Sequence, residues 1–368
     1  MSTNMTWIRP RDLSANFQPD GRMMVRSIST GVGALLPSWV AGILAYCSEP
    51  RSKSDIADAL GPRAIQVLDQ LIEIGLLRSP EEQENEVMFN NFAGVPVHRR
   101  MLDDEIRLDA YRRAIEATVK PGDVVIDAGS GTGILALYAA KAGARKVYAI
   151  EQSDFADWIP VMAEHNGVGE IVELIRGNFG AVQLSEKADV LVTETFGAWA
   201  LAEGAASELD LCIQRNLKAE ASLIPSHIQL HAFGLAERPN LLLEPFRVRD
   251  DGIDLSPMRD EAYLRSENIW LEGTHHPQQI ARLRLQENQL SGHIELDSPA
   301  QALALHFTLE LAPSVHLPTG PHDPKTHWKQ TVIACDLPSG AHPITAAPSP
   351  EDKRTLLVEL GNKSYRVR

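Results

Sequence analysis

Residues 87–223 alternate short apolar runs with helical stretches, and this alternation constrains the fold more than any other feature. The runs are DVVIDAG, KVYAIE, VELIRG and DVLVTE, each about as long as a buried strand. Strands separated by helices pair in parallel, because a parallel connection needs a crossover of a dozen or more residues. The sequence therefore predicts a parallel α/β sheet covered by helices.

From Pro225 onward the pattern changes to strand-like runs separated by turns rich in proline and glycine. In LALHFTLEL the apolar side chains occupy alternate positions, which is the period of a strand with one buried face. This pattern predicts an antiparallel β sandwich or barrel over residues 225–368. The stretch from about 237 to 262 interrupts the pattern and is expected to be an inserted arm.

Residues 20–80 are expected to form helices, within a small domain that covers residues 1–85. SKSDIADAL opens with a serine suited to capping a helix, and RAIQVLDQLIEIGLL carries apolar residues at helical spacing. The order of helices resembles a winged-helix domain. It also loosely resembles the peptide-recognition domains attached to enzymes that modify ribosomally made peptides. A helical cap for packing or dimerisation is the alternative.

Charge and cysteine spacing limit the partners of this chain. The formal net charge is −14, which disfavours nucleic acid, because phosphate binding needs a basic surface. Cys47, Cys212 and Cys335 form no CxxC pair, so we expect a reducing, cytoplasmic compartment and no metal site. The longest apolar run, residues 31–47, contains Pro37 and is shorter than the ~20 residues of a membrane helix, so no membrane contact is expected.

The stretch DVVIDAGSGTGILALYAA, residues 123–140, predicts a strand, a glycine-rich turn and a helix that bind a cofactor. A dinucleotide site needs G-x-G-x-x-G, whereas here the third glycine comes one residue early. Asp127 precedes the turn, where its carboxylate repels a pyrophosphate but attracts the amino group and sulfonium of S-adenosylmethionine. Glu151 ends the next strand, where an acidic residue typically accepts hydrogen bonds from ribose hydroxyls. These features favour S-adenosylmethionine.

Two glutamates in VTETFGAWALAEGA, Glu194 and Glu203, flank an almost uncharged stretch directly after a predicted strand. A buried carboxylate needs a positive partner, because burial without one is costly. A guanidinium is planar and permanently charged, so two carboxylates can hold two of its edges. One such glutamate alone would be better explained as a surface residue or as the partner of a lysine or arginine of the fold, but the pair indicates a site for a substrate cation.

Several segments together resemble the protein arginine methyltransferase family, from about residue 88 to the C-terminus. They are HRRMLDDEIRLDAYR (98–112), DAGSGTG, IEQS, the two-glutamate hairpin and THWKQT (326–331). The resemblance implies a Rossmann-like class I methyltransferase domain over residues 86–224, followed by an antiparallel β-barrel over residues 225–368. It also implies a dimerisation arm inserted in the barrel and a head-to-tail homodimer.

The same resemblance implies a role for each matching residue. Glu194 and Glu203 would grip the guanidinium, and the pair of His327 and Asp104 would lie beside it. Arg107 would bind the methionine carboxylate of the cofactor. The other cofactor-binding residues are expected to be Phe89, Met101, Asp127, Gly129, Ser130, Gly131, Thr132, Gly133 and Glu151.

The chain departs from the family pattern at four places. The family's Tyr-Phe-x-x-Tyr helix is MFNNF here, so Met88 and Phe92 replace both tyrosines. Gly180 stands where a glutamate often contacts the adenine, and Thr195-Phe196 where Trp-Met follows the first glutamate. The N-terminal 80 residues match nothing usual in the family. These departures indicate a divergent, bacterial-type member with an unusual substrate.

Together the features predict an S-adenosylmethionine-dependent N-methyltransferase that modifies the guanidino group of arginine. Its partner is expected to be an arginine-containing peptide or protein, or free L-arginine in natural-product biosynthesis. Two alternatives stay open: methyl transfer to another acceptor such as an amine, and a non-enzymatic regulator that senses the ligand.

Overall fold

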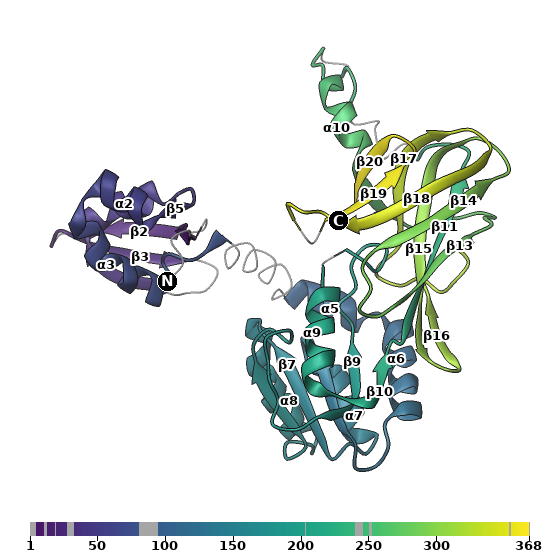
Figure 1. Ribbon diagram of the computed structural model, residues 1–368, viewed down its shortest axis with the longest axis horizontal. Coiled ribbons are helices and arrows are strands. Elements are labelled where there is room, and N and C mark those ends of the chain that lie inside the picture. Colours follow the sequence, from purple (N-terminus) through teal and green to yellow (C-terminus); the bar gives the residue numbers. More distant parts are fainter. Residues whose placement is uncertain are drawn as a thin grey trace. The chain divides into compact units, whose positions relative to one another are not determined.

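The computed structural model divides into two compact units, Met1–Val97 and His98–Arg368 (Figure 1). It describes residues 5–10, 13–18, 20–27, 33–80, 95–202, 204–239, 246–249, 252–352 and 355–367. Glu203 and Phe89, two of the predicted site residues, lie outside these ranges, as do Met88 and Phe92. The division into three domains stays a prediction.

The N-terminal unit combines a small antiparallel sheet with the helices α1, α2 and α3. The sheet has the strand order β2-β3-β4, and a separate pair is formed by β1 and β5. The bounds are β1 Thr6–Trp7, β2 Leu13–Phe17, β3 Arg22–Ser27, β4 Gly33–Pro37, η1 Ser38–Val40, α1 Ala41–Tyr46, β5 Arg51–Ser52, α2 Lys53–Leu60 and α3 Pro62–Glu73.

Helix α2 begins as its sequence predicts. The Ser52 hydroxyl accepts a hydrogen bond from the Asp55 backbone N–H at 3.2 Å, and the Asp55 carboxylate accepts one from the Ser52 N–H at 2.8 Å. This reciprocal capping satisfies two N–H groups that have no partner inside the helix. In α3, Pro62 occupies the first turn, where its fixed φ and missing N–H cost nothing.

The sheet of the N-terminal unit was not predicted, because an apolar residue on its outer face hides the strand pattern. In β3, Met23 and Val25 are buried, and they pack with Ile56 and Leu68 of the helices. Between them Met24 is 39% exposed although it is apolar. The segment RMMVRS therefore lacks the clean alternation that identifies a half-buried strand.

The first half of the larger unit is the predicted parallel sheet. Its described strands lie in the order β10-β9-β6-β7-β8, and all neighbours are parallel. The order reverses next to β6, and in open α/β sheets ligands bind at the carboxyl ends of the strands where that happens. The bounds are α5 Val95–Leu102, α6 Glu105–Thr118, β6 Val124–Ala128, α7 Ile134–Lys141, β7 Lys146–Glu151, η2 Asp154–Asp157, α8 Trp158–His165, β8 Val172–Arg176, β9 Ala188–Thr193, α9 Ala206–Asn216 and β10 Leu217–Ile224.

The second half is built from antiparallel strands, as the alternating pattern predicts (Figure 1). One sheet has the order β12-β17-β15-β11-β13 with β16 paired to β15, and another has the order β14-β18-β19-β20. The bounds are β11 His227–Leu235, β12 Ser266–Ile269, β13 Gln278–Arg284, β14 Leu290–Leu296, β15 Ala300–Ala312, β16 Val315–Pro318, β17 Gln330–Leu337, β18 Gly340–Pro348, β19 Leu356–Leu360 and β20 Lys363–Val367.

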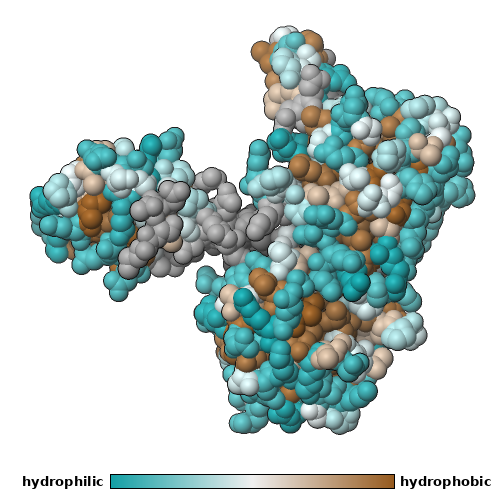
Figure 2. Space-filling model, viewed as in Figure 1, coloured by the Kyte–Doolittle hydropathy of each residue, from teal (hydrophilic) through white to brown (hydrophobic). Residues whose placement is uncertain are grey.

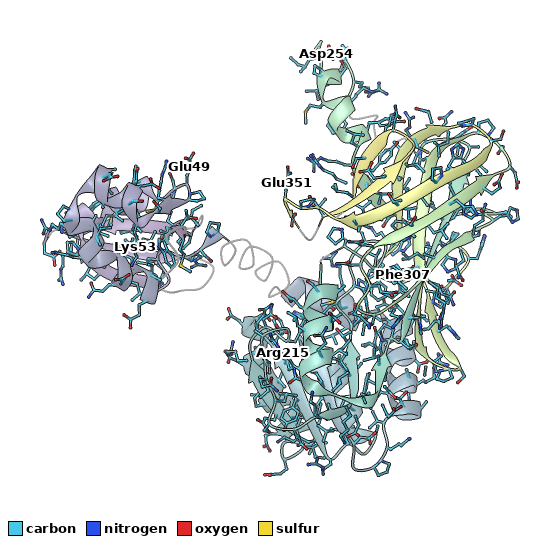
Figure 3. The ribbon with its side chains drawn as sticks, in the orientation of Figure 1. Glu49, Lys53, Arg215, Asp254, Phe307 and Glu351 are labelled. Atoms are coloured by element: carbon cyan, nitrogen blue, oxygen red, sulfur yellow. The ribbon has the colours of Figure 1, made fainter. Side chains whose placement is uncertain are left out.

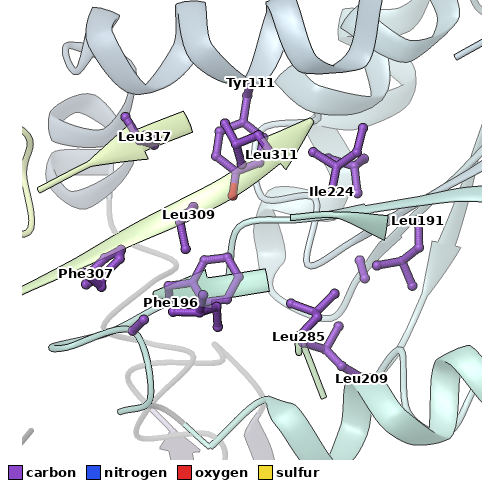
Figure 4. Close-up of a cluster of buried hydrophobic side chains, with 14 of the residues drawn as sticks. Tyr111, Leu191, Phe196, Leu209, Ile224, Leu285, Phe307, Leu309, Leu311 and Leu317 are labelled. Atoms are coloured by element: carbon purple, nitrogen blue, oxygen red, sulfur yellow. The ribbon is translucent and has the colours of Figure 1, made fainter. Parts of the chain in front are cut away.

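One apolar core joins the parallel sheet to the antiparallel strands. Tyr111 of α6 is fully buried, and it belongs to the same cluster as Phe196 of the hairpin after β9 and Phe307 of β15 (Figure 4). The hydroxyl of Tyr111 also donates a hydrogen bond to the carbonyl of Thr193 at 2.9 Å. The continuous core fixes the segment around Glu194 against the strands that carry the predicted THWKQT motif.

The predicted arm lies partly within the described residues. Its helical part consists of η4, Ser256–Met258, and α10, Arg259–Tyr263, which project from the strands (Figure 1). Asp254 lies near the outer end of this segment (Figure 3). The side chains of Val248, Ile253 and Met258 are each more than half exposed, and hydrophobic residues are visible at this end of the molecule (Figure 2).

None of the described helices is long and apolar enough to cross a membrane.

Candidate active site

Of the predicted cofactor residues, Asp127, the glycine turn after it and Glu151 lie at the carboxyl ends of β6 and β7. Gly129, Gly131 and Gly133 all have positive φ, and α7 begins directly after them. A Cβ on Gly131 would lie 3.0 Å from Cε1 of His98, and a Cβ on Gly129 would lie 2.7 Å from Cγ2 of Thr195. Only glycine gives this turn both its backbone conformation and its close contacts.

Asp127 is a fully buried carboxylate at the end of β6. Its Oδ2 accepts a hydrogen bond from the Ala136 N–H in α7 at 3.0 Å, and its Oδ1 has no partner among the described residues. Burial, with a smaller contribution from the nearby carboxylates of Glu151 and Glu194, raises the pKa of Asp127 to about 7. A cationic amino group would satisfy Oδ1 and offset this cost, so the site fits S-adenosylmethionine.

Glu151 ends β7 and closes the glycine turn. Its Oε2 accepts a hydrogen bond from the Gly131 N–H at 2.7 Å. Its Oε1 accepts from the N–H groups of Gln152 and Ser153 at 2.9 and 2.7 Å. These bonds hold the carboxylate rigidly, and a carboxylate has about four acceptor positions, so capacity for ribose hydroxyls remains.

Glu194 follows β9 and forms an ion pair with Arg107 of α6. Both side chains are buried, with 8% and 5% of their surface exposed. Burial raises the pKa of Glu194 although the charge of Arg107 opposes this. The positive group that Glu194 faces in the structure is therefore the protein's own guanidinium.

Besides the nitrogen that pairs with Glu194, the Arg107 guanidinium has two other nitrogens in different surroundings. Its Nη2 donates to the carbonyl oxygen of Met101, and its buried Nε has no partner among the described residues. The structure thus brings together Arg107, Met101 and Glu194. The role of Arg107 in binding the cofactor's carboxylate stays a prediction.

Asp104 and His327 form the predicted pair, although they are 223 residues apart. Oδ2 of Asp104 accepts hydrogen bonds from the backbone N–H and from Nδ1 of His327, both at 2.9 Å, while Oδ1 caps α6 by accepting from the Arg107 N–H at 3.0 Å. Burial raises the pKa of Asp104, but the bonds from His327 and Arg107 outweigh it and hold that pKa below its usual value. Nδ1 of His327 is therefore the protonated ring nitrogen.

The hairpin after Glu194 has a strained backbone. Trp199 and Ala200 both have positive φ although neither is glycine, and both are buried. The indole N–H of Trp328 donates to the Phe196 carbonyl at 2.6 Å, which ties the hairpin to the His327 segment. Strain of this kind persists only where packing over-determines the conformation, and it concentrates at functional sites. The placement of Glu203 at the end of this hairpin lies outside the described residues.

His98 is a site residue that the sequence analysis missed. It lies on α5, is buried, contacts the Phe155 ring at 3.7 Å between centroids, and packs against Gly131. The signal was present, because His98 is the first residue of the segment HRRMLDDEIRLDAYR. A histidine needs the glycine turn beside it to be recognised as part of the pocket, and only the fold provides that neighbour.

Comparison with known proteins supports this arrangement. The profile of the ribosomal protein L11 methyltransferase family matches residues 112–228. Protein arginine N-methyltransferase 6 of Danio rerio is 29% identical over 282 residues, which is 69% of this chain and 80% of that protein. A probable protein arginine N-methyltransferase 6 of Arabidopsis thaliana is 26% identical over 387 residues, which is 85% of this chain and 88% of that protein.

The chain is similar to protein arginine N-methyltransferases over most of its length.

Solved structures of arginine methyltransferases share its fold. The Trypanosoma brucei PRMT1 enzyme–prozyme complex with AdoHcy has a TM-score of 0.67 at 24% identity, over 75% of this chain and 99% of that one. Protein arginine methyltransferase 10 of Arabidopsis thaliana has a TM-score of 0.62 at 23% identity, over 76% and 97%. The predicted Rossmann-like domain with a following β-barrel is thereby confirmed.

Proposed function

We propose that this arginine methyltransferase transfers a methyl group from S-adenosylmethionine to a guanidino nitrogen of arginine in a peptide or protein. The observation that carries the proposal is the ion pair of buried Glu194 with the guanidinium of Arg107. It lies beside the glycine turn, because Thr195 contacts Gly129. A carboxylate at the end of β9 thus already binds the chemical group that the reaction modifies.

Residues of β6, β7 and α5 would hold the cofactor. Asp127 would pair with its amino group, Glu151 would accept from the ribose, and Gly131 would lie against it with His98 alongside. Ser130 and Thr132 complete the turn, and Ser130 donates to the Asp127 carbonyl at 2.9 Å. The bound S-adenosylmethionine supplies an electrophilic methyl group on a sulfonium.

Arg107 would serve the cofactor and Glu194 at the same time. A guanidinium has five N–H donors, and in Arg107 the Nε donor remains for a carboxylate. Held between the two, Arg107 keeps a positive charge next to Glu194 and favours its ionised form. An ionised Glu194 is required to bind a substrate guanidinium.

Glu194 and Glu203 would align the substrate and draw its charge toward the held nitrogens. Orientation of a reactant in this way can lower a barrier by ~7–11 kcal/mol. As the N–CH₃ bond forms and the S–CH₃ bond breaks, the reacting nitrogen must lose a proton. Nε2 of His327 can accept it, because Nδ1 donates to Asp104 and 24% of the side chain is exposed. Glu203 is the alternative acceptor.

The N-terminal unit would bind part of the peptide outside the active site. Its three-strand sheet and helices form a core of their own, separate from that of the larger unit.

Methylation of free L-arginine in natural-product biosynthesis is the second candidate function. It is supported by the replacement of both tyrosines of the family pattern by Met88 and Phe92, which indicates an unusual substrate.

The test is incubation of the full-length protein with isotope-labelled S-adenosylmethionine and a panel of guanidines, read by mass spectrometry. The panel contains arginine peptides, free L-arginine and peptides encoded next to the gene. Methylated arginine in wild type and a loss of at least 100-fold in Glu194→Gln support the proposal. Methyl transfer that survives in Glu194→Gln and Glu203→Gln shows a different acceptor, and cofactor binding with no turnover supports the regulator.

We also propose that the protein is a homodimer joined through the arm. The exposed apolar side chains Val248, Ile253 and Met258 support this, because exposed apolar clusters mark interaction surfaces.

A cytoplasmic location is proposed as well, and it is supported by Cys47, Cys212 and Cys335, which are buried thiols without disulfides.

A further inference from the structure

Two lysines flank an exposed tryptophan next to the His327 segment. Trp270 follows β12 and is 47% exposed. The Lys325 and Lys329 ammonium groups lie 5.2 and 5.0 Å from the centroid of its ring. The indole N–H of Trp270 donates to the Thr326 carbonyl at 3.3 Å, so the ring is attached to the same loop as both lysines. We call Lys325, Trp270 and Lys329 the cationic platform.

The platform is fixed close to the active site. Its lysines are two residues before and two residues after His327, whose ring bonds to Asp104. Lys329 has a φ of 61°, a conformation that persists because its neighbours are locked. Trp328 donates to the Phe196 carbonyl, and the Gln330 amide donates to the Thr319 carbonyl at 2.8 Å.

The platform has charge available for an anion. Lys325 pairs with Glu272 at 3.6 Å, but the two side chains are 59% and 85% exposed, and exposed pairs contribute little. Lys329 forms no ion pair within the described parts of the chain. Glu272 shows that a carboxylate fits beside Lys325, and its exposure leaves it replaceable by another carboxylate.

The sign of this charge is opposite to that of the neighbouring pocket. Asp104 and Glu194 are acidic and buried, and the whole chain carries −14. A substrate that complements both regions has its target guanidinium in the acidic pocket and a negative group a short distance away. Residues one or two places from the target along an extended peptide are displaced by about 3–7 Å, so a carboxylate on such a residue lies close to the target arginine.

We propose that the cationic platform binds a substrate carboxylate adjacent to the target arginine, and so selects arginines in acidic surroundings. This inference rests on the proposed function. The carboxylate has two sources, an aspartate or glutamate beside the arginine within a peptide, or the α-carboxylate of a C-terminal or free arginine. Substrates with lysine or arginine beside the target are disfavoured, since the platform repels them.

The test compares kcat/KM for capped peptides that differ only beside one arginine, using the full-length protein. The flanking residues are glycine, aspartate or lysine. A second pair ends in arginine with a free carboxylate or an amide, and L-arginine is compared with L-argininamide. At low salt, wild type is expected to have a kcat/KM about tenfold higher for a carboxylate-bearing substrate than for its neutral counterpart. The comparison that shows this preference identifies the source of the carboxylate.

Variants of the platform test its role. Lys325→Gln and Lys329→Gln are each expected to reduce that preference about threefold, through KM, without a matching loss on the glycine-flanked peptide. Lys325→Glu is expected to shift the preference toward the lysine-flanked peptide. Glu272→Gln is expected to lower KM for the preferred carboxylate substrate about twofold.

The matched control is Lys363→Gln. The Lys363 ammonium lies 4.0 Å from the Tyr263 ring centroid, so it forms the same type of contact on the arm side of the barrel. It is expected to leave the preference unchanged. Equal kcat/KM for acidic and neutral substrates in wild type, or an unchanged preference in both lysine variants, overturns this inference alone. A wild type that methylates no guanidine overturns the proposed function and this inference with it.

Discussion

Arg107 and Glu194 form an ion pair with both side chains more than nine-tenths buried, although they are 87 residues apart in the chain. Two buried charges need each other, because either one alone would be left uncompensated in a low-dielectric environment. The pair connects α6, which also carries Asp104, to the end of β9. Glu194, which is predicted to bind the substrate guanidinium, is thereby kept in place by Arg107, which is predicted to contact the cofactor.

Removal of Arg107 is expected to destabilise the protein strongly. In Arg107→Ala, Glu194 remains buried without a partner, and breaking a buried pair in this way costs about 3–5 kcal/mol. Urea unfolding at pH 7 measures the loss. Arg145→Ala is the control, because Arg145 pairs with Glu186 at the surface, where the expected loss is below about 1 kcal/mol. Similar losses in the two variants would contradict the importance of the buried pair.

Cofactor binding is expected to be linked to a proton on Asp127. Burial raises the pKa of this carboxyl to about 7, so below that pH it must lose a proton before it can pair with an amino cation. Affinity for S-adenosylmethionine should therefore rise with pH through about 7 and then level off. Calorimetry in buffers of different ionisation enthalpy measures the proton released. Asp127→Asn should bind more weakly and without this pH dependence; an unchanged pH profile in that variant would refute the linkage.

The Asp104 and His327 pair is expected to stabilise the protein above about pH 4. The folded-state pKa of Asp104 is lowered, so the carboxylate is favoured by folding, and this stability is lost as pH falls through that pKa. Asp104→Asn retains a side chain that caps α6 but loses the charge, so it should show a smaller loss of unfolding free energy between pH 6 and pH 3. Asp103→Asn, at an exposed neighbouring position, should behave as wild type.

Crowding at the glycine turn is expected to weaken cofactor binding. In Gly131→Ala the new Cβ lies 3.0 Å from His98 and the backbone keeps a positive φ, which together should cost about 1–3 kcal/mol of stability. Gly122→Ala is matched, since Gly122 also has positive φ but a Cβ there meets nothing within 4 Å. Both variants should lose stability from backbone strain, and Gly131→Ala alone should raise the Kd for S-adenosylmethionine. Equal Kd values would show that the turn does not contact the cofactor.

The arm is expected to hold two copies together. Ile253→Glu places a charge on its exposed apolar surface, so light scattering should find the mass fall from twice 40.5 kDa toward 40.5 kDa. Leu211→Glu alters an exposed leucine of α9 instead and should leave the mass unchanged. A wild type of 40.5 kDa at micromolar concentration would rule out the proposed dimer.

The local patterns of this sequence determined the elements that follow from neighbouring residues alone. The strand before Gly129 and the strand ending in Glu151 are continuous apolar runs, and their parallel pairing follows from the helices between them. The cap at Ser52 and the alternation through Phe307 are equally local. Where exposed apolar residues blurred the period, as at Met24, the sequence alone missed the sheet.

The tertiary structure alone decided which charged groups meet. Nothing near Glu194 in the chain identifies Arg107 as its partner, and nothing near Asp104 specifies His327, because these contacts arise when distant segments pack on one core. Burial then makes each charge depend on the neighbour that folding provides. The sequence by itself predicted most of the candidate groups, such as Asp127 and Glu194, and only the folded chain set their partners and their protonation.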